Sequence, residues 1–110
     1  MLFADSDDVG ADIIIEDDVM IGSGVHIYVT THRYDDTNVP ISYQGFFESK
    51  NVVLKKGCWI GANCVILPGV TIGENTVVGA GSIVTKDIQA RTLAVGNPAK
   101  VLREIHKQDT

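Results

Sequence analysis

The sequence predicts an all-β domain that winds as a parallel β-helix of six-residue units, and three observations support this. An aliphatic residue recurs at every sixth position, glycine often follows it, and a small or β-branched residue stands four positions later. Aromatic residues make up only 6% of the 110 residues, whereas Val and Ile are abundant, so β-branched aliphatic side chains must build the core. The length corresponds to a single domain.

The six-residue ladder runs in two stretches, and every position is aliphatic except the first. Its members are Phe3, Val9, Ile15, Ile21 and Ile27, then Leu54, Ile60, Ile66, Ile72, Val78 and Val84. Neither simple β alternation nor a helical stripe has a strict period of six. Each unit therefore needs a short strand and a turn, and three units close a triangular coil. We expect each ladder residue to point to the axis of the coil.

The other positions of the unit agree with a closed coil. Asn63 and Asn75 suit corners at which the backbone reaches positive φ. Four positions after each ladder residue stands a side chain that should also face inward: Ile13, Val19, Val25, Thr31, Cys58, Cys64, Val70, Thr76, Ser82 and Ile88. Only Asp7 breaks this rule. Two cysteines provide neither a disulfide framework nor a four-ligand metal site, so Cys58 and Cys64 are interpreted as small buried hydrophobic residues.

Between Thr31 and Leu54 the period fails and the ladder changes phase. This predicts an excursion loop over about 33–53. A long irregular insert in a regular solenoid is usually functional or disordered. Its aromatic residues favour an ordered loop that packs against something, with a neighbouring subunit as the expected partner: Tyr34, Tyr43, Phe46 and Phe47.

The two ends of the chain differ in character. After Val84 the chain should close the coil, turn at 96–98 and form a short helix near 99–107, so that a cap and tail occupy about 90–110. The first coil carries Asp5, Asp7, Asp8 and Asp12, and charge on an open strand edge discourages end-to-end stacking.

Composition excludes several classes of function. A formal net charge of −5 argues against nucleic acid as a partner, although local basic groups can still bind an anion. No run of residues is long and apolar enough for membrane insertion, and the N-terminus lacks a basic segment followed by an apolar one. We therefore expect a cytoplasmic protein.

This six-residue unit resembles the hexapeptide-repeat acyltransferase superfamily, and the resemblance covers nearly the whole chain. Within it, the chain is similar to sugar and polysaccharide O-acetyltransferases and to the maltose and galactoside acetyltransferase branch. The resemblance implies a left-handed coil, a homotrimer with active sites between subunits, and acetyl-CoA as co-substrate with no metal required. Relatives usually carry more chain before this point, so the chain is expected to be short at its N-terminus.

His32 is the candidate general base. It ends the segment Tyr28-Val-Thr-Thr-His32, which resembles the T-x-H motif of relatives that acetylate hydroxyl groups. A sugar hydroxyl is a poor nucleophile at neutral pH, and a base that accepts its proton accelerates attack by about 10²–10⁴-fold. The alternative is a solvated loop histidine. His26 and His106 lack any comparable context.

The resemblance also implies a set of donor-binding residues. Trp59 would lie by the thioester end of the donor, or instead be a surface aromatic at a trimer interface. Main-chain groups near Ala62 and Ala80 would hydrogen-bond the pantetheine arm. Thr85 and Lys86 would lie further along coenzyme A. Lys100 and Arg103 would lie near its nucleotide phosphates. For Lys86 the alternative is a solvated charge.

The acceptor site is predicted to involve Tyr34, Asp35 and Asp36. The two carboxylates could bind sugar hydroxyls or orient His32, and the alternative is that they are solvated loop residues. Maltose and galactoside acetyltransferases place an Asn about thirty residues before the catalytic His. Counting back from His32 reaches Met1 and Leu2, with no Asn nearby, and Asp5 is a possible substitute.

Together with these residues, the resemblance implies an enzyme that transfers acetyl directly to a hydroxyl of a sugar or polysaccharide-precursor acceptor within a ternary complex. One alternative is a xenobiotic (antibiotic) O-acetyltransferase with the same base. Another is a catalytically inactive β-helix that serves as a binding or scaffold module. A zinc enzyme of the γ-carbonic-anhydrase type is set aside, because the spacing of the three histidines does not place them on a common face.

Overall fold

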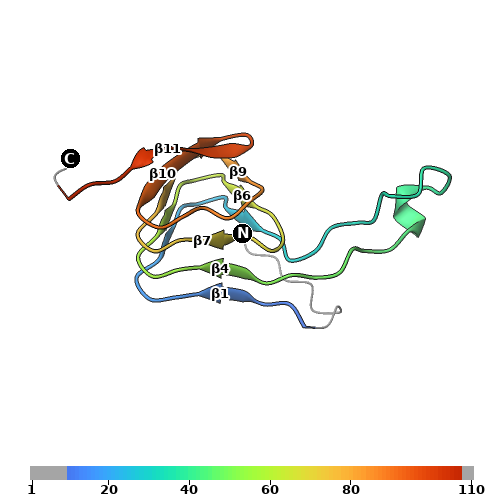
Figure 1. The fold of residues 1–110 in the computed structure, drawn as a ribbon. Coiled ribbons are helices and arrows are strands. Elements are labelled where there is room, and N and C mark those ends of the chain that lie inside the picture. Colours follow the sequence, from blue (N-terminus) through green and yellow to red (C-terminus); the bar gives the residue numbers. More distant parts are fainter. Residues whose placement is uncertain (1–9, 108–110) are drawn as a thin grey trace.

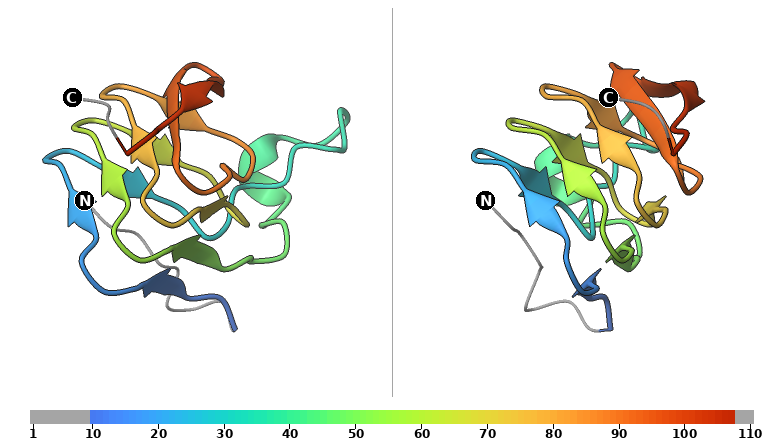
Figure 2. Two further views of the ribbon diagram at one scale, coloured as in Figure 1. Left: turned by 60° about the vertical axis from the view of Figure 1, so that its left-hand side comes forward. Right: turned by 90° about the vertical axis from the view of Figure 1, so that its left-hand side faces the viewer.

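The chain folds as a three-sided parallel coil in a computed structural model that describes residues 10–107 (Figures 1 and 2). Three sheets form its sides. The first contains β1 (Ile13–Ile15), β4 (Val52–Leu54) and β7 (Thr71–Ile72). The second contains β2 (Met20–Ile21), β5 (Trp59–Ile60), β8 (Val77–Val78), β10 (Thr92–Gly96) and β11 (Ala99–Glu104). The third contains β3 (His26–Ile27), β6 (Val65–Ile66) and β9 (Ile83–Val84).

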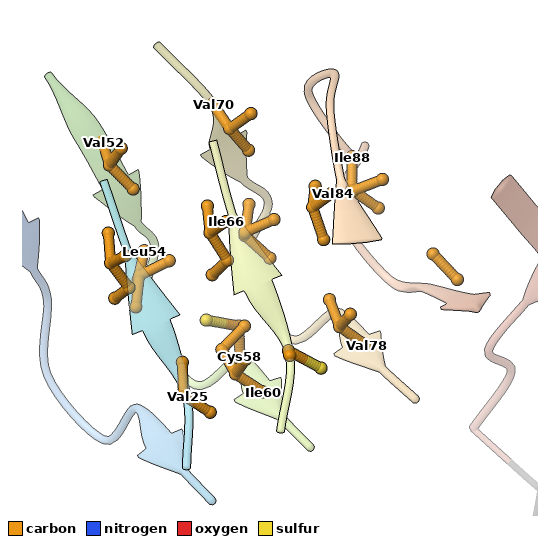
Figure 3. Packing of buried hydrophobic residues seen from close by; sticks show 14 of the residues in the cluster. Val25, Val52, Leu54, Cys58, Ile60, Ile66, Val70, Val78, Val84 and Ile88 are labelled. Carbon is orange, nitrogen blue, oxygen red and sulfur yellow. The ribbon is translucent and has the colours of Figure 1, made fainter. Parts of the chain in front are cut away.

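The ladder residues fill the axis of the coil, as predicted. Leu54 pairs with Ile72 and Ile66 with Val84, so equivalent residues of successive coils lie eighteen positions apart. The ladder side chains from the middle of the coil are fully buried: Ile27, Leu54, Ile60, Ile66, Ile72, Val78 and Val84. Figure 3 shows how such residues pack together inside the coil. The early positions Phe3 and Val9, with Asp5, Asp7 and Asp8, lie outside the described residues.

The phase change in the ladder comes from an insertion that leaves the coil in register. Ile15 pairs with Leu54, and Ile27 pairs with Ile66. Partners in these pairs are 39 positions apart, which is 21 more than in a regular coil. The connection between β3 and β4 therefore contains 21 additional residues, and it projects away from the coil (Figure 1). It includes the short 3₁₀ helix η1 (Ile41–Tyr43).

Most of the second set of inward positions is buried, but the prediction for Thr31 is wrong. Cys58, Cys64 and Val70 are buried, whereas Thr31 is exposed. The chain leaves the coil before Thr31, and the buried Val52 occupies the inward position next to Val70 when the chain returns. The six-residue period therefore ends before Thr31, one position earlier in the ladder than the sequence predicted.

Glycine permits the close approach of successive coils, and asparagine permits the positive φ values at their corners. A Cβ atom added to Gly61 would lie 2.6 Å from the backbone nitrogen of Ala80 in the next coil, so a side chain has no room there. Asn63 and Asn75 have φ values of 60° and 52°, as predicted for corner residues.

The predicted C-terminal helix is wrong. Residues 99–104 form β11, which pairs antiparallel with β10 and places Lys100 opposite Val95. Ile105 extends the pairing by donating its N–H to the carbonyl of Arg91 (2.8 Å). Helix propensity is a weak preference, and pairing satisfies backbone groups of β10 that a helix would leave open. Within residues 10–107, no helix is long and apolar enough to cross a membrane.

We expect the ladder isoleucines to differ in their contribution to stability according to their burial. Ile66 is fully buried and Ile15 is 41% exposed, although both occupy the same ladder position. Ile66→Ala should lower the free energy of unfolding by about 2–5 kcal/mol, because it leaves a cavity in the coil. Ile15→Ala should cost much less. Urea unfolding followed by circular dichroism measures both, and equal losses would contradict this account of the core.

Candidate active site

The excursion leaves the coil through a short two-stranded base. The carbonyl of Thr31 accepts the N–H of Phe47 (2.9 Å), and the N–H of Arg33 donates to the carbonyl of Gly45 (2.8 Å). The Thr30 hydroxyl also donates to the carbonyl of Phe47 (2.8 Å). These bonds hold the outgoing and returning segments together where they meet the coil. The segments are thus ordered at the point where His32 lies.

His32 faces Phe46 across this base. The two residues form an antiparallel bridge, and their rings stack with centroids 4.5 Å apart and planes inclined by 26°. His32 is exposed, and within residues 10–107 its ring makes no hydrogen bond or ion pair. An imidazole in this state can accept a proton from a molecule that approaches from solvent.

Asp35 and Asp36 form contacts within the excursion rather than with His32. Asp35 pairs with Arg33 (Nη2 to Oδ2, 2.6 Å), and this hydrogen bond lowers the pKa of the Asp35 carboxyl below its ordinary value. Asp36 Oδ1 accepts the N–H of Asn38 (3.0 Å). Gln44 secures the tip, because its Nε2 donates to the carbonyl of Asp36 (2.8 Å). In the described part of the chain, neither carboxylate hydrogen-bonds to His32.

An open depression of about 370 Å³ lies on the excursion. Asp35, Asp36, Arg33, Gln44 and Val39 line it. The two predicted carboxylates therefore share one surface. Sequence reasoning missed Arg33 and Gln44. Arg33 lies next to His32 but belongs to no motif, and Gln44 is identified only by its hydrogen bonds across the tip of the excursion.

Tyr34 lies beside this region with its ring exposed. It contacts Phe47 edge to face, with ring centroids 5.2 Å apart, and Arg33 places its guanidinium 5.2 Å from the centre of the same Phe47 ring. Phe47 thus supports the residues on one side of the excursion, whereas Phe46 contacts His32. Sequence reasoning named both phenylalanines only as apolar surface.

Four of the predicted donor residues fall on two corners of the coil. Ala62 and Ala80 follow β5 and β8 in adjacent coils, where the N–H of Gly81 donates to the carbonyl of Ala62 (2.8 Å). Thr85 and Lys86 are exposed and follow β9, at the corner from which the excursion departs after β3. Of the two groups, only Thr85 and Lys86 share a corner with the segment that carries His32.

Strand β11 places a basic residue in line with Trp59. Trp59 is 48% exposed on β5 and pairs with Val77. Val77 pairs with Leu93, and Leu93 pairs with Arg103 on β11. Trp59 and Arg103 therefore occupy one row across the second sheet, and Lys100 lies on the same outer strand. A helix over these residues would not have produced this row.

The cysteines are unsuited to nucleophilic chemistry. Cys58 and Cys64 are fully buried. Burial raises the pKa of the Cys58 thiol to about 11 and also raises the pKa of the Cys64 thiol. Cys64 Sγ donates to the carbonyl of Gly79 (3.2 Å). Within residues 10–107, no group of three or more His, Cys, Asp or Glu residues is arranged to hold a metal ion.

Comparison with known proteins adds to this geometry. Residues 51–86 match the family model for the bacterial transferase hexapeptide (six repeats). The galactoside O-acetyltransferase of Escherichia coli (strain K12) is 42% identical over 97 residues, which are 88% of this chain and 46% of that protein. The chain spans about half the length of the curated relatives it matches.

Solved structures give the same picture. A galactoside acetyltransferase in complex with coenzyme A has a TM-score of 0.80 and 42% identity, with 88% of this chain and 47% of that chain covered. A maltose O-acetyltransferase from Clostridium difficile 630 has a TM-score of 0.77 and 42% identity, with 86% and 49% covered. The likeness to these hexapeptide-repeat acetyltransferases implies the left-handed sense of the coil.

The raised pKa of Cys58 should make stability depend on pH in the alkaline range. The folded-state value of about 11 exceeds the ordinary value of 9.0, so the unfolded state loses its proton first. The neutral thiol's contribution is complete below pH 9 and is lost as the pH rises toward 11. Over that interval wild type should lose about 2 kcal/mol more unfolding free energy than Cys58→Ala.

Urea titrations of the two proteins across this pH interval measure the difference. The variant serves as the control for the other groups that titrate in the alkaline range, because it retains all of them, including Cys64. Parallel losses of stability in the two proteins would contradict the assignment.

Proposed function

We propose that this chain, a hexapeptide-repeat protein homologous to galactoside and maltose O-acetyltransferases, transfers acetyl from acetyl-CoA to a hydroxyl group. The acceptor is a sugar or a polysaccharide precursor. The observation that carries the proposal is the 42% identity over 88% of the chain to a galactoside acetyltransferase whose structure contains coenzyme A. The position of His32, at the base of the excursion in this coil, adds independent support.

His32 acts as the general base in this mechanism. Its ring accepts the acceptor's hydroxyl proton while the hydroxyl oxygen attacks the thioester carbonyl. The new C–O bond forms, the C–S bond breaks, and the departing CoA sulfur receives a proton from the imidazolium. The exposed imidazole, with no hydrogen bond or ion pair within residues 10–107, supports this role.

Transfer occurs directly between two bound substrates rather than through an acyl-enzyme. Cys58 and Cys64 are buried and their thiols have raised pKa values, so neither supplies a thiolate at the surface. An intermediate on sulfur would require these side chains to leave the core. Direct attack by the acceptor hydroxyl in a ternary complex needs only the base and two adjacent binding surfaces.

The donor lies in a groove between subunits of a homotrimer. Trp59 and the Ala62–Ala80 corner lie on a different part of the coil from His32, so one subunit would provide the former and its neighbour the latter. Arg103 shares a row with Trp59, which suits a ligand with an apolar arm and phosphates at its far end. Lys100 adds a second positive charge on β11. Thr85 and Lys86 line the corner from which the excursion departs.

The acceptor occupies the depression on the excursion. Asp35 and Asp36 offer carboxylate oxygens to sugar hydroxyls, and Arg33 offers donors beside them. The exposed ring of Tyr34 supplies a flat surface next to this polar group. These features favour a polyhydroxylated ligand over an apolar one. An antibiotic acceptor and a non-catalytic scaffold are the alternatives that the following experiment separates.

Replacing His32 should abolish most of the transfer. We expect His32→Ala to lower kcat by about 10²–10⁴-fold with little change in coenzyme A binding, because only proton transfer is lost. The measurement is release of free thiol from acetyl-CoA over a panel of sugars, polysaccharide precursors and antibiotics. His106→Ala is the matched control, since His106 is exposed in the tail beyond β11.

Three results would overturn parts of the proposal. Unchanged turnover in His32→Ala removes the general base. Turnover with antibiotics alone replaces the sugar acceptor. If calorimetry detects no binding of coenzyme A to the wild-type chain, the proposal of an acetyltransferase is wrong and the non-catalytic scaffold is favoured.

The two corner lysines provide a test of the donor groove. Lys86 and Lys55 are both exposed, but Lys55 follows β4, on a corner that the proposal leaves outside the groove. Loss of a charge-assisted contact costs about 1.5–3 kcal/mol, so Lys86→Ala should weaken coenzyme A binding by roughly 10-fold or more. Lys55→Ala should not. Calorimetric titration at low salt measures both, and equal effects would contradict the assignment of Lys86.

A further inference from the structure

We propose that Phe46 is the positioning residue for His32, an inference that rests on the proposed function. The Phe46 ring stacks on the imidazole with centroids 4.5 Å apart and planes inclined by 26°. Phe46 neither gives nor takes a proton in the proposed mechanism and acts only through its contact with His32. Its role is to hold the plane of the base where the excursion leaves the coil.

The backbone imposes this contact. The hydrogen bond from Phe47 to Thr31 and the one from Arg33 to Gly45 flank the pair formed by His32 and Phe46. That pattern defines a non-hydrogen-bonded antiparallel pair, the type in which opposite side chains lie closest. The stacking therefore follows from the register of the two segments.

Stacking can restrain a general base without occupying either ring nitrogen. An exposed histidine turns about two side-chain bonds, and within residues 10–107 no hydrogen bond or ion pair restrains the His32 ring. A partner on the ring face limits both rotations while both nitrogens at the ring edge stay open to a hydroxyl proton. A displacement of about 1 Å at a reacting group can cost roughly 10²-fold in rate, so restraint of the ring has kinetic value.

The neighbouring phenylalanine has a different task. Phe47 contacts Tyr34 edge to face and lies under the Arg33 guanidinium. Successive side chains of an extended segment point to opposite sides, so Phe46 and Phe47 cannot both face His32. Gly45, with φ of +79°, shapes the backbone immediately before the pair. The assignment is therefore specific to Phe46.

Steady-state kinetics of three variants test the assignment. Phe46→Leu keeps an apolar side chain but removes the ring face, and we expect kcat to fall about 10-fold or more, less than in His32→Ala, with KM for acetyl-CoA unchanged. Phe46→Tyr restores the ring face and should recover most of kcat. Tyr43→Leu is the matched control, because it removes an 80% exposed ring from the same excursion and should leave kcat unchanged.

The outcomes separate this inference from the proposed function. Wild-type kcat in Phe46→Leu, with a large loss in His32→Ala, overturns the positioning role alone. A low kcat in Phe46→Tyr equal to that of Phe46→Leu also overturns it. A wild-type chain that transfers acetyl to no acceptor overturns the proposed function, and the positioning role with it.

A second measurement tests the contact without relying on activity. The Phe46 ring current should displace the NMR resonances of the His32 ring protons, and Phe46→Leu should remove that displacement. Tyr43→Leu should leave these resonances where they are in wild type. Identical His32 resonances in wild type and Phe46→Leu would show that the rings do not stack in solution and would overturn the inference.

Discussion

Every part of this molecule depends on the packing of one ladder side chain on the equivalent side chain of the next coil. Leu54 and Ile72 illustrate the arrangement, because both are fully buried and their strands pair directly. This packing requires the coils to approach closely, and Gly61 is where that approach leaves no space for a side chain. A coil with these properties is a rigid support, since the inner strands β4, β5, β6, β8 and β10 each pair with a neighbour on both sides.

A rigid coil gives an irregular segment a defined place from which to depart. The excursion adds 21 residues between β3 and β4, yet the coils on either side remain paired in register. Ordering the excursion costs conformational entropy. Hydrogen bonds of Thr30, Thr31 and Phe47 where the excursion meets the coil, and of Gln44 at its tip, offset this cost. His32 thus lies in an irregular segment that hydrogen bonds hold where it meets the coil and at its tip.

Charge and burial divide the surface into regions with different uses. The chain is acidic as a whole, but one row of the second sheet carries an aromatic side chain, Trp59, and a positive charge, Arg103, three strands away. The depression on the excursion combines Asp35 and Asp36 with Arg33. The thiols, which are the strongest nucleophiles in the chain, are confined to the core. The proposed direct transfer, which needs no acyl-enzyme, agrees with this distribution.

The period of six determined the coil, the ladder and the corner residues from sequence alone, because each of these features is repeated in every unit and needs only local spacing. Ile66 and Asn63 were assigned correctly for that reason. Thr31, residues 99–107 and the contact of Phe46 with His32 were decided by the tertiary structure. Each depends on pairing between segments that the period does not describe: the return of Val52 to the coil, the open edge of β10, and the register of the excursion's two segments.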